Sequence, residues 1–309
     1  MNIRKCVFGF WILWIGVVGA VSGQQFQLQN VPNKVSGTYT LDSELVIPAT
    51  FTVRHRGAAS SYFVTFSTGQ SGSFDPRLAT TTGGATLSYQ LYDSSLSRNV
   101  LKDLSVTPAP QEVLSGSFPD DSRWSSQDLS FVVVVPPGQF PQAGTYEDTI
   151  TLTLYSGTLD SYVQKAQRTF RVSITMPSIT ELSLVPPGAP FNASSTSSTL
   201  NFGILETGKT QAIDVMVRSN QLYSLSLVSQ FGNALRIIDP TDTSEIPFYI
   251  TINGNPVSLT PNVSFLVVSS AGPTPYAGAR YALSFTIQDA DFPTSGDYSC
   301  VLTFTLQAQ

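Results

Sequence analysis

Apolar and polar residues alternate along most of this sequence in short runs. In the run from 298 to 308, one face is apolar and the other is mostly Ser and Thr; the first face comprises Tyr298, Cys300, Leu302, Phe304, Leu306 and Ala308. This alternation predicts a strand that covers a core on one side and meets water on the other. Similar runs recur roughly every 8 to 15 residues between Gly, Pro and Asn, and long helical patterns are missing. We therefore predict an all-β protein built from antiparallel sandwiches or barrels.

An internal repeat divides the chain. The segment FPQAGTYEDTITLTLY (140–155) aligns without gaps on FPTSGDYSCVLTFTLQ (292–307). Weaker matches follow in the same order upstream, pairing 49–69 with 211–232 and 85–93 with 245–254. Matches in the same order over such a length indicate two homologous domains. We predict two tandem immunoglobulin-like or pilin-like β-sandwich domains of barrel-like form, over 24–176 and 177–309.

The two copies differ after their last matching strand. The first copy continues through a turn into YVQKAQRTFRVSITM (162–176), where Phe170, Val172, Ile174 and Met176 alternate with polar residues. This pattern predicts one more half-buried strand, which closes the first domain. The second copy has no such segment, so we predict that its domain lacks its last strand.

A sandwich without its last strand exposes an apolar groove and a row of unpaired backbone groups. Each apolar side chain that covered such a groove would contribute about 1.5 kcal/mol or more, besides the ladder hydrogen bonds. Strand addition from a partner chain would supply that cover. The residues predicted to line the groove are Leu302, Phe304, Leu306, Ala308, Ile213 and Val215.

The first 23 residues have the pattern of a secretory signal. Arg4 and Lys5 precede an apolar run from about Val7 to Val18, and small residues follow. We predict cleavage near Gly23 and Gln24, with an uncleaved anchor as the alternative. No apolar stretch after the signal is long enough to span a bilayer.

Charge and cysteine content narrow the function further. Without the signal, 14 of the 16 basic residues remain against 21 acidic ones, a net charge of −7. An acidic exported chain argues against nucleic acid and anionic lipid as partners. Cys300 is then the single cysteine, so we predict no internal disulfide and stability that comes from sheet packing.

Several segments resemble a known family. The string AGTYEDTITLTLY (143–155) resembles the end signature of spore coat protein U (SCPU) domains, which form the pilins of archaic, or σ-type, chaperone–usher fimbriae. STLNFGILETG (198–208), VRSNQLYSLSLVS (217–229) and FYITINGNPV (248–257) resemble the family's Phe-Gly early strand, central strands and Asn-Gly hairpin. The resemblance is good over 180–309 and weaker over 37–176.

Two such domains in tandem resemble a tip adhesin, a non-enzymatic cell-surface subunit that mediates attachment to surfaces. The resemblance implies a self-complete outer domain that binds a host or abiotic surface. It implies a pilin domain whose groove is filled first by a periplasmic chaperone and then, after passage through an outer-membrane usher, by the N-terminal strand of an adjacent pilin subunit. The segment QQFQLQNVPNKV (24–35) has few apolar residues and would itself be a poor donor strand. Unlike many family members, the chain has no early cysteine pair, and Cys300 stands where the first copy has Asp148.

Catalytic chemistry has little support in the sequence. The single histidine, His55, shares a face with Phe51 and Val53 and has no nucleophile motif beside it, so we predict a core or rim residue. No acidic pair has the spacing of a calcium loop, and we predict no metal or cofactor.

Gly- and Ser-rich segments of the first domain carry aromatic residues that could contact a sugar or an apolar surface, namely Phe74, Phe118 and Trp124. The alternative is that each of these side chains fills its own end of the barrel. An alternative function is a free-standing secreted carbohydrate-binding or spore/cell-coat β-sandwich protein whose open edge is covered by homodimerisation.

Overall fold

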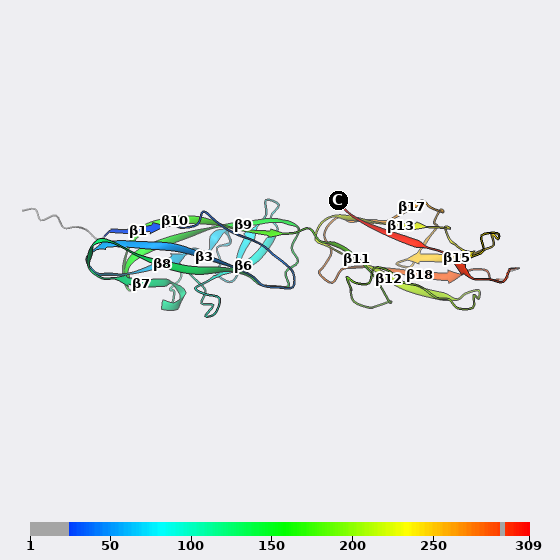
Figure 1. Ribbon diagram of the computed structural model, residues 1–309, viewed down its shortest axis with the longest axis horizontal. Helices are drawn as coiled ribbons and strands as arrows, with labels where there is room; N and C mark the ends of the chain where they lie inside the picture. Colours follow the sequence, from blue (N-terminus) through cyan, green and yellow to red (C-terminus); the bar gives the residue numbers. More distant parts are fainter. Residues whose placement is uncertain (1–24, 291–293) are drawn as a thin grey trace, which may run out of the picture.

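The computed structural model describes residues 25–290 and 294–309, so the predicted signal over 1–23 lies outside the described residues. The all-β prediction is confirmed. Helical structure in the described part is limited to two short 3-10 turns, η1 (Gly69–Ser71) and η2 (Pro110–Glu112). None of the described helices is long and apolar enough to cross a membrane. Two β lobes lie end to end (Figure 1).

The N-terminal lobe is a barrel-like sandwich whose ten strands form one sheet. Eight of them follow the path β1-β3-β8-β6-β5-β9-β10-β2, and β4, off this path, pairs with β7 and β9. Most neighbours are antiparallel, but β2 runs parallel to β10. The strands are β1 (Gln25–Gln29), β2 (Lys34–Thr38), β3 (Leu45–Gly57), β4 (Ser60–Phe66), β5 (Arg77–Thr80), β6 (Thr86–Tyr92), β7 (Leu114–Phe118), β8 (Asp121–Val135), β9 (Gly144–Thr158) and β10 (Ser161–Met176).

The C-terminal lobe has two sheets, ordered β11-β12-β18-β15-β14-β19 and β17-β13-β20, with β16 paired to β15. The β15–β16 hairpin turns through Asn253 and Gly254, both at positive φ, as the Asn-Gly pair in the sequence indicates. The strands are β11 (Thr180–Val185), β12 (Thr210–Ser219), β13 (Tyr223–Ser229), β14 (Ala234–Ile237), β15 (Glu245–Ile252), β16 (Asn255–Val257), β17 (Ser264–Ser269), β18 (Ala279–Ile287), β19 (Tyr298–Ser299) and β20 (Leu302–Ala308).

The repeat found in the sequence is present in the strand order. Each sheet path starts with the same series of pairings, β1-β3-β8-β6 in one lobe and β11-β12-β18-β15 in the other. In both lobes a tyrosine hydroxyl donates to the carbonyl four residues upstream: Tyr146 to Gln142 at 2.6 Å and Tyr298 to Thr294 at 3.2 Å. The gapless alignment over 140–155 therefore corresponds to similar local structure in both lobes, but β9 is continuous, whereas its copy is interrupted at Cys300 and Val301 between β19 and β20. Residues 292–293 lie outside the described residues.

Each lobe has its own hydrophobic core, one centred on Phe51, Phe66 and Phe131 and the other on Phe248 and Phe285. The lobes meet at Asn220, whose buried side chain holds the connecting segment. Its Oδ1 accepts from the Ile179 N–H, its Nδ2 donates to the Pro177 carbonyl, and its carbonyl accepts from the Ala143 N–H of the first lobe. These bonds tie the connecting segment to both lobes, and the Phe140 and Tyr276 rings, 5.8 Å apart, add a second contact between the lobes.

Candidate functional site: an open groove in the C-terminal lobe

The strand equivalent to β9 in the C-terminal lobe has only one of its two edges paired. In the N-terminal lobe, β9 pairs with β4 and β5 on one edge and with β10 along the whole of the other. In the C-terminal lobe, β19 and β20 pair with β14 and β13, the counterparts of β5 and β4. Among the described residues, no strand pairs with the second edge of β20.

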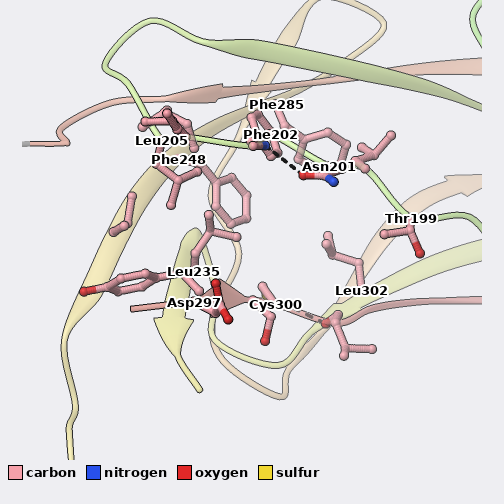
Figure 2. A pocket seen from close by; sticks show the side chains of 18 of the residues that line it. Thr199, Asn201, Phe202, Leu205, Leu235, Phe248, Phe285, Asp297, Cys300 and Leu302 are labelled. Carbon is pink, nitrogen blue, oxygen red and sulfur yellow. Dashed lines mark hydrogen bonds between the residues drawn. The ribbon is translucent and has the colours of Figure 1, made fainter. Parts of the chain in front are cut away.

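A cavity of about 900 Å³ lies beside this free edge. Leu302 and Cys300 face it from one side, and Phe202 and Phe248 face it from the other (Figure 2). We call this cavity and the free edge of β20 the groove. Its wall is mainly apolar, and the apolar side chains that line it include Leu200, Phe202, Leu205, Leu235, Ile246, Phe248, Phe285, Leu302 and Phe304.

The inward side chains of β9 and β20 differ in how deeply they are buried. In the first lobe, Ile150, Leu152 and Leu154 of β9 are completely buried. Their equivalents in the repeat, Leu302, Phe304 and Leu306, alternate inward in the same way but stay half-buried. In the first lobe the cover comes from β10, whose Phe170, Val172, Ile174 and Met176 are at most 2% exposed.

The segment before β12 differs from its counterpart in the same region. The resemblance predicts an early strand over 198–208, but the structure has no strand there, and Leu200, Phe202 and Leu205 only rest against the core. In the first lobe the corresponding strand, β2, is held by its parallel pairing with β10. The expected strand is missing because the partner that would provide its backbone hydrogen bonds is missing.

One position in the groove is uncharged, unlike the matching place in the first lobe, although the exposed Asp297 also lines the cavity. Asp148 is buried there and accepts hydrogen bonds from the Tyr89 hydroxyl at 2.6 Å and from the Gln70 and Thr149 N–H groups. Burial and the Asp148 carboxylate raise the pKa of Tyr89, and burial lowers the pKa of nearby Arg77 to about 10. In the groove, Cys300 replaces Asp148 and contacts the Ser229 hydroxyl at 3.3 Å. An apolar side chain can therefore enter without displacing a buried charge.

The groove residues named from the sequence are distributed unevenly. Leu302, Phe304 and Ile213 line the cavity. Val215 is fully buried in the core behind it, while Leu306 continues the inward face of β20 and Ala308 is exposed near the lobe junction. Phe202, Phe248 and Phe285 also line the cavity but were not predicted from the sequence. The Phe-Gly pair at 202–203 was a usable signal for the first of these, but only the fold shows that the other two face the same space.

The structure corrects the interpretation of Phe118 and Trp124 as loop residues, because both lie in strands, whereas Phe74 does lie in a loop. Phe118 ends β7 and is buried, with its ring stacked on His55 at 5.3 Å and on Tyr62 at 5.2 Å. Phe74 is 9% exposed and packs on the guanidinium of buried Arg77. Both side chains are thus buried in their own lobe, as in the alternative interpretation. Trp124 lies in β8 and is partly exposed.

His55 is buried as predicted and lies 4.4 Å, ring to ring, from Phe26. Neither ring nitrogen has a hydrogen-bond partner, and burial lowers the pKa of the imidazole, with a smaller opposing effect from Asp120. Over 25–290 and 294–309, no group of His, Cys, Asp and Glu side chains is arranged to hold a metal ion.

Comparison with known proteins gives one family match. The family model described as the Spore Coat Protein U domain matches residues 31–153. The match falls in the half of the chain whose motifs resemble the family more weakly. No curated protein matches the sequence significantly.

Several solved structures are similar to the chain. In a chaperone–tip adhesion subunit pre-assembly complex from the archaic chaperone–usher Csu pili of Acinetobacter baumannii, the similar chain has 14% identity and a TM-score of 0.42, covering 91% of this chain and 100% of that one. The CupB6 tip adhesin from Pseudomonas aeruginosa has 10% identity and a TM-score of 0.38, covering 91% and 94%. CfaE, the adhesive subunit of CFA/I fimbria of enterotoxigenic Escherichia coli, has 10% identity and a TM-score of 0.37, covering 91% and 94%.

Proposed function

We propose that this chain, whose residues 31–153 match the Spore Coat Protein U domain model, is a non-enzymatic subunit of a cell-surface fimbria. Its C-terminal lobe receives a strand from another chain. The observation that carries the proposal is the free edge of β20 beside an apolar cavity of about 900 Å³. The same edge of β9 in the first lobe is filled by β10.

The first lobe serves as a template for the bound strand. There β10 runs antiparallel to β9, with Phe170 opposite Ile150 and Val172 opposite Asp148. The repeat transfers this register to the C-terminal lobe. One apolar side chain of the donor strand then lies opposite Leu302, and the side chain two residues further along the donor lies opposite Cys300. Such a strand pairs with β20 on one side and converts 198–202 into the counterpart of β2 on the other. Each buried side chain contributes about 1.5–3 kcal/mol.

The direction of this strand sets the direction of assembly. β20 runs toward the lobe junction, where the Gln309 N–H donates to the Leu222 carbonyl (Figure 1). An antiparallel donor therefore enters at the junction and leaves at the far end of the C-terminal lobe. The donating subunit then lies on the side opposite the N-terminal lobe, which is left free to face outward.

The use of β1 supports a terminal position in the fibre. This strand pairs with β3 in its own lobe, and its Phe26 and Leu28 are buried in the core there. A strand built into its own sandwich cannot at the same time complete the groove of another subunit. We therefore place the chain at the tip, with 24–176 as the adhesin domain and 177–309 as the pilin domain.

The proposed route follows from the groove. An exposed apolar groove has to be covered during export, so a periplasmic chaperone strand occupies it first and the usher exchanges it for the strand of an adjacent pilin subunit. The mature protein is then extracellular, on the fimbria, where the N-terminal lobe contacts a host or abiotic surface.

Cys300 provides a direct test of donor binding and its register. A peptide with the sequence of Arg168–Met176 serves as a donor-strand probe, and its Val172→Cys form places a thiol opposite Cys300. We expect this form to cross-link to the full chain under mild oxidation, because opposed residues of an antiparallel pair suit disulfide geometry. The Ser173→Cys peptide, whose thiol points to the other face, should not. Equal cross-linking of both peptides, or of neither, contradicts the proposal.

A further inference from the structure

Two arginines and a tryptophan form a cluster on the outer face of the N-terminal lobe, away from the groove. Arg54 and Arg56 project outward from β3, and Trp124 projects from the adjacent strand β8. Both guanidinium carbons lie 5.0 Å from the centroid of the Trp124 ring. Asp42, shortly before β3, accepts a hydrogen bond from the Tyr276 hydroxyl of the C-terminal lobe. β3 runs away from that lobe, so Arg54 and Arg56, near the end of β3, lie in the remote half of the N-terminal lobe (Figure 1).

The sheet explains why these side chains are held together. Arg54 is opposite Ser126 in the β3–β8 register, so Trp124 lies one outward position away on the neighbouring strand. The electron-rich ring attracts both cations and limits the rotamers that their long side chains can adopt. Trp124 is thus a positioning residue that keeps two positive charges side by side.

The two charges are not neutralised by the protein. Within residues 25–290 and 294–309, neither Arg54 nor Arg56 forms an ion pair, whereas six other basic side chains do. Their side-chain partners are glutamines of β1: Arg54 Nη1 donates to Gln29 at 3.4 Å and Arg56 Nε donates to Gln25 at 2.7 Å. Arg54 Nε is buried without an acceptor. A pair of cations in an acidic protein, with donors to spare, indicates an anionic ligand.

The surroundings limit which anion fits. Gln25 and Gln29 present amide groups beside the cations, and Asp128 lies two outward positions along β8 from Trp124. A nucleic acid or an anionic bilayer presents dense, uniform negative charge, which Asp128 and the acidic chain would repel. A polymer with spaced carboxylates and many hydroxyls matches these side chains better. Its carboxylates can pair with the two guanidinium groups, and its hydroxyls can form hydrogen bonds with the glutamine amides and the Asp128 carboxylate.

We propose that Arg54 and Arg56, held by Trp124, form a binding site for an acidic polysaccharide of the polyuronate class. The inference rests on the proposed role of the N-terminal lobe as the surface-binding part of a fimbrial subunit, and it names the ligand of that lobe. Each guanidinium pairs with the carboxylate of a uronic acid residue, and the glutamines of β1 contact the ring hydroxyls.

Binding of the full chain to immobilised polygalacturonate tests the site. We expect saturable binding that falls as salt rises from 0.05 to 1 M, since the pairs are exposed. The double substitution Arg54→Gln/Arg56→Gln should weaken binding by roughly tenfold or more. Trp124→Ala should also weaken it while leaving the unfolding midpoint of the lobe near that of the wild type. Lys165→Gln/Arg168→Gln, which removes the same charge from β10, should bind like the wild type.

Three results would overturn the inference: no binding of the wild type, equal binding by the Arg54→Gln/Arg56→Gln variant, or equal binding to polyglutamate, which has carboxylates without sugar hydroxyls. Neutral dextran should not bind. These outcomes are separate from the proposed function, because the Val172→Cys peptide still reports on the groove. A chain that traps the peptide but ignores polygalacturonate keeps the fimbrial proposal and loses this one.

Discussion

The strands β9 and β20 are copies of the same element in two environments. A Gly-x-Tyr sequence starts β9 and precedes β20, both strands alternate apolar and polar residues, and both pair with the equivalent central strand, β4 or β13. Over residues 25–290 and 294–309, β9 has a second neighbour and β20 has none, and of the two strands only β9 has its inward side chains fully buried. Alternation in a strand thus determines which side chains point inward, whereas their burial depends on a strand that comes from elsewhere in the fold.

The first prediction uses equivalent residues in the two strands and has the largest expected effect. Ile150→Ala removes a fully buried side chain and should lower the free energy of unfolding of the N-terminal lobe by about 2–5 kcal/mol. Leu302→Ala should cost the C-terminal lobe clearly less, because Leu302 is only half-buried. Urea unfolding of each full-length variant, followed separately for the two lobes, measures both values.

Adding the donor peptide should reduce the difference between the two substitutions in the free energy of unfolding that they cost. With peptide Arg168–Met176 bound, Leu302→Ala should approach the cost of Ile150→Ala, and the peptide should bind this variant less tightly. Thr303→Ala, on the exposed face of β20, serves as the control and should change neither quantity. Equal losses at Ile150 and Leu302 without peptide would mean that the groove is already closed.

The second prediction concerns pH, where the lobes differ because the only histidine lies in the first. Burial lowers the pKa of His55 in the folded chain, so the unfolded chain binds a proton that the folded chain does not. The free energy of unfolding of the N-terminal lobe should therefore fall as pH drops below about 6.5, by up to roughly 1 kcal/mol per unit.

Trp124 fluorescence reports this transition, because Trp124 is the only tryptophan after the predicted signal. The C-terminal lobe should show little change between pH 5 and 7. His55→Leu should remove the dependence in that window, and a wild-type lobe that is equally stable at pH 5 and 7 would contradict the assignment of His55 as a neutral buried group.

The third prediction has the smallest effect and tests what the lobes share. Tyr146→Phe and Tyr298→Phe each delete a hydroxyl that donates to the carbonyl four residues upstream, at 2.6 and 3.2 Å. Each should lower the free energy of unfolding of its own lobe by about 0.5–1.5 kcal/mol, with the larger loss for the shorter bond. A loss in the other lobe would mean that the two cores are coupled.

Sequence patterns predicted the strands of this chain well, since period-2 alternation and the Asn-Gly turn depend on neighbouring residues only. The repeat predicted the extra strand of the first lobe, Phe170 to Met176, and the absence of its counterpart. The repeat could not show that Phe248 and Phe285 line the groove, because these residues and Leu302 lie in different sheets and meet only when the two sheets pack together.

The aromatic residues show a second limit of sequence patterns. Phe118 and Trp124 lie six residues apart in a Ser-rich segment, and both looked like loop residues. The chain turns between β7 and β8, which pair with different strands, and this puts one ring in the core and the other outside. Which face each ring takes follows from the register with β4 and β3, which is a property of the sheet.

Residue-resolved hydrogen exchange of the full chain tests the central claim most directly. Every second backbone N–H of β20 points away from β13, toward the free edge. The account predicts that these N–H groups exchange rapidly and become protected when peptide Arg168–Met176 is added, while those of β9 are protected throughout. If the free-edge N–H groups of β20 are as protected as those of β9 without any peptide, the C-terminal lobe is complete and the claim of an open groove is wrong.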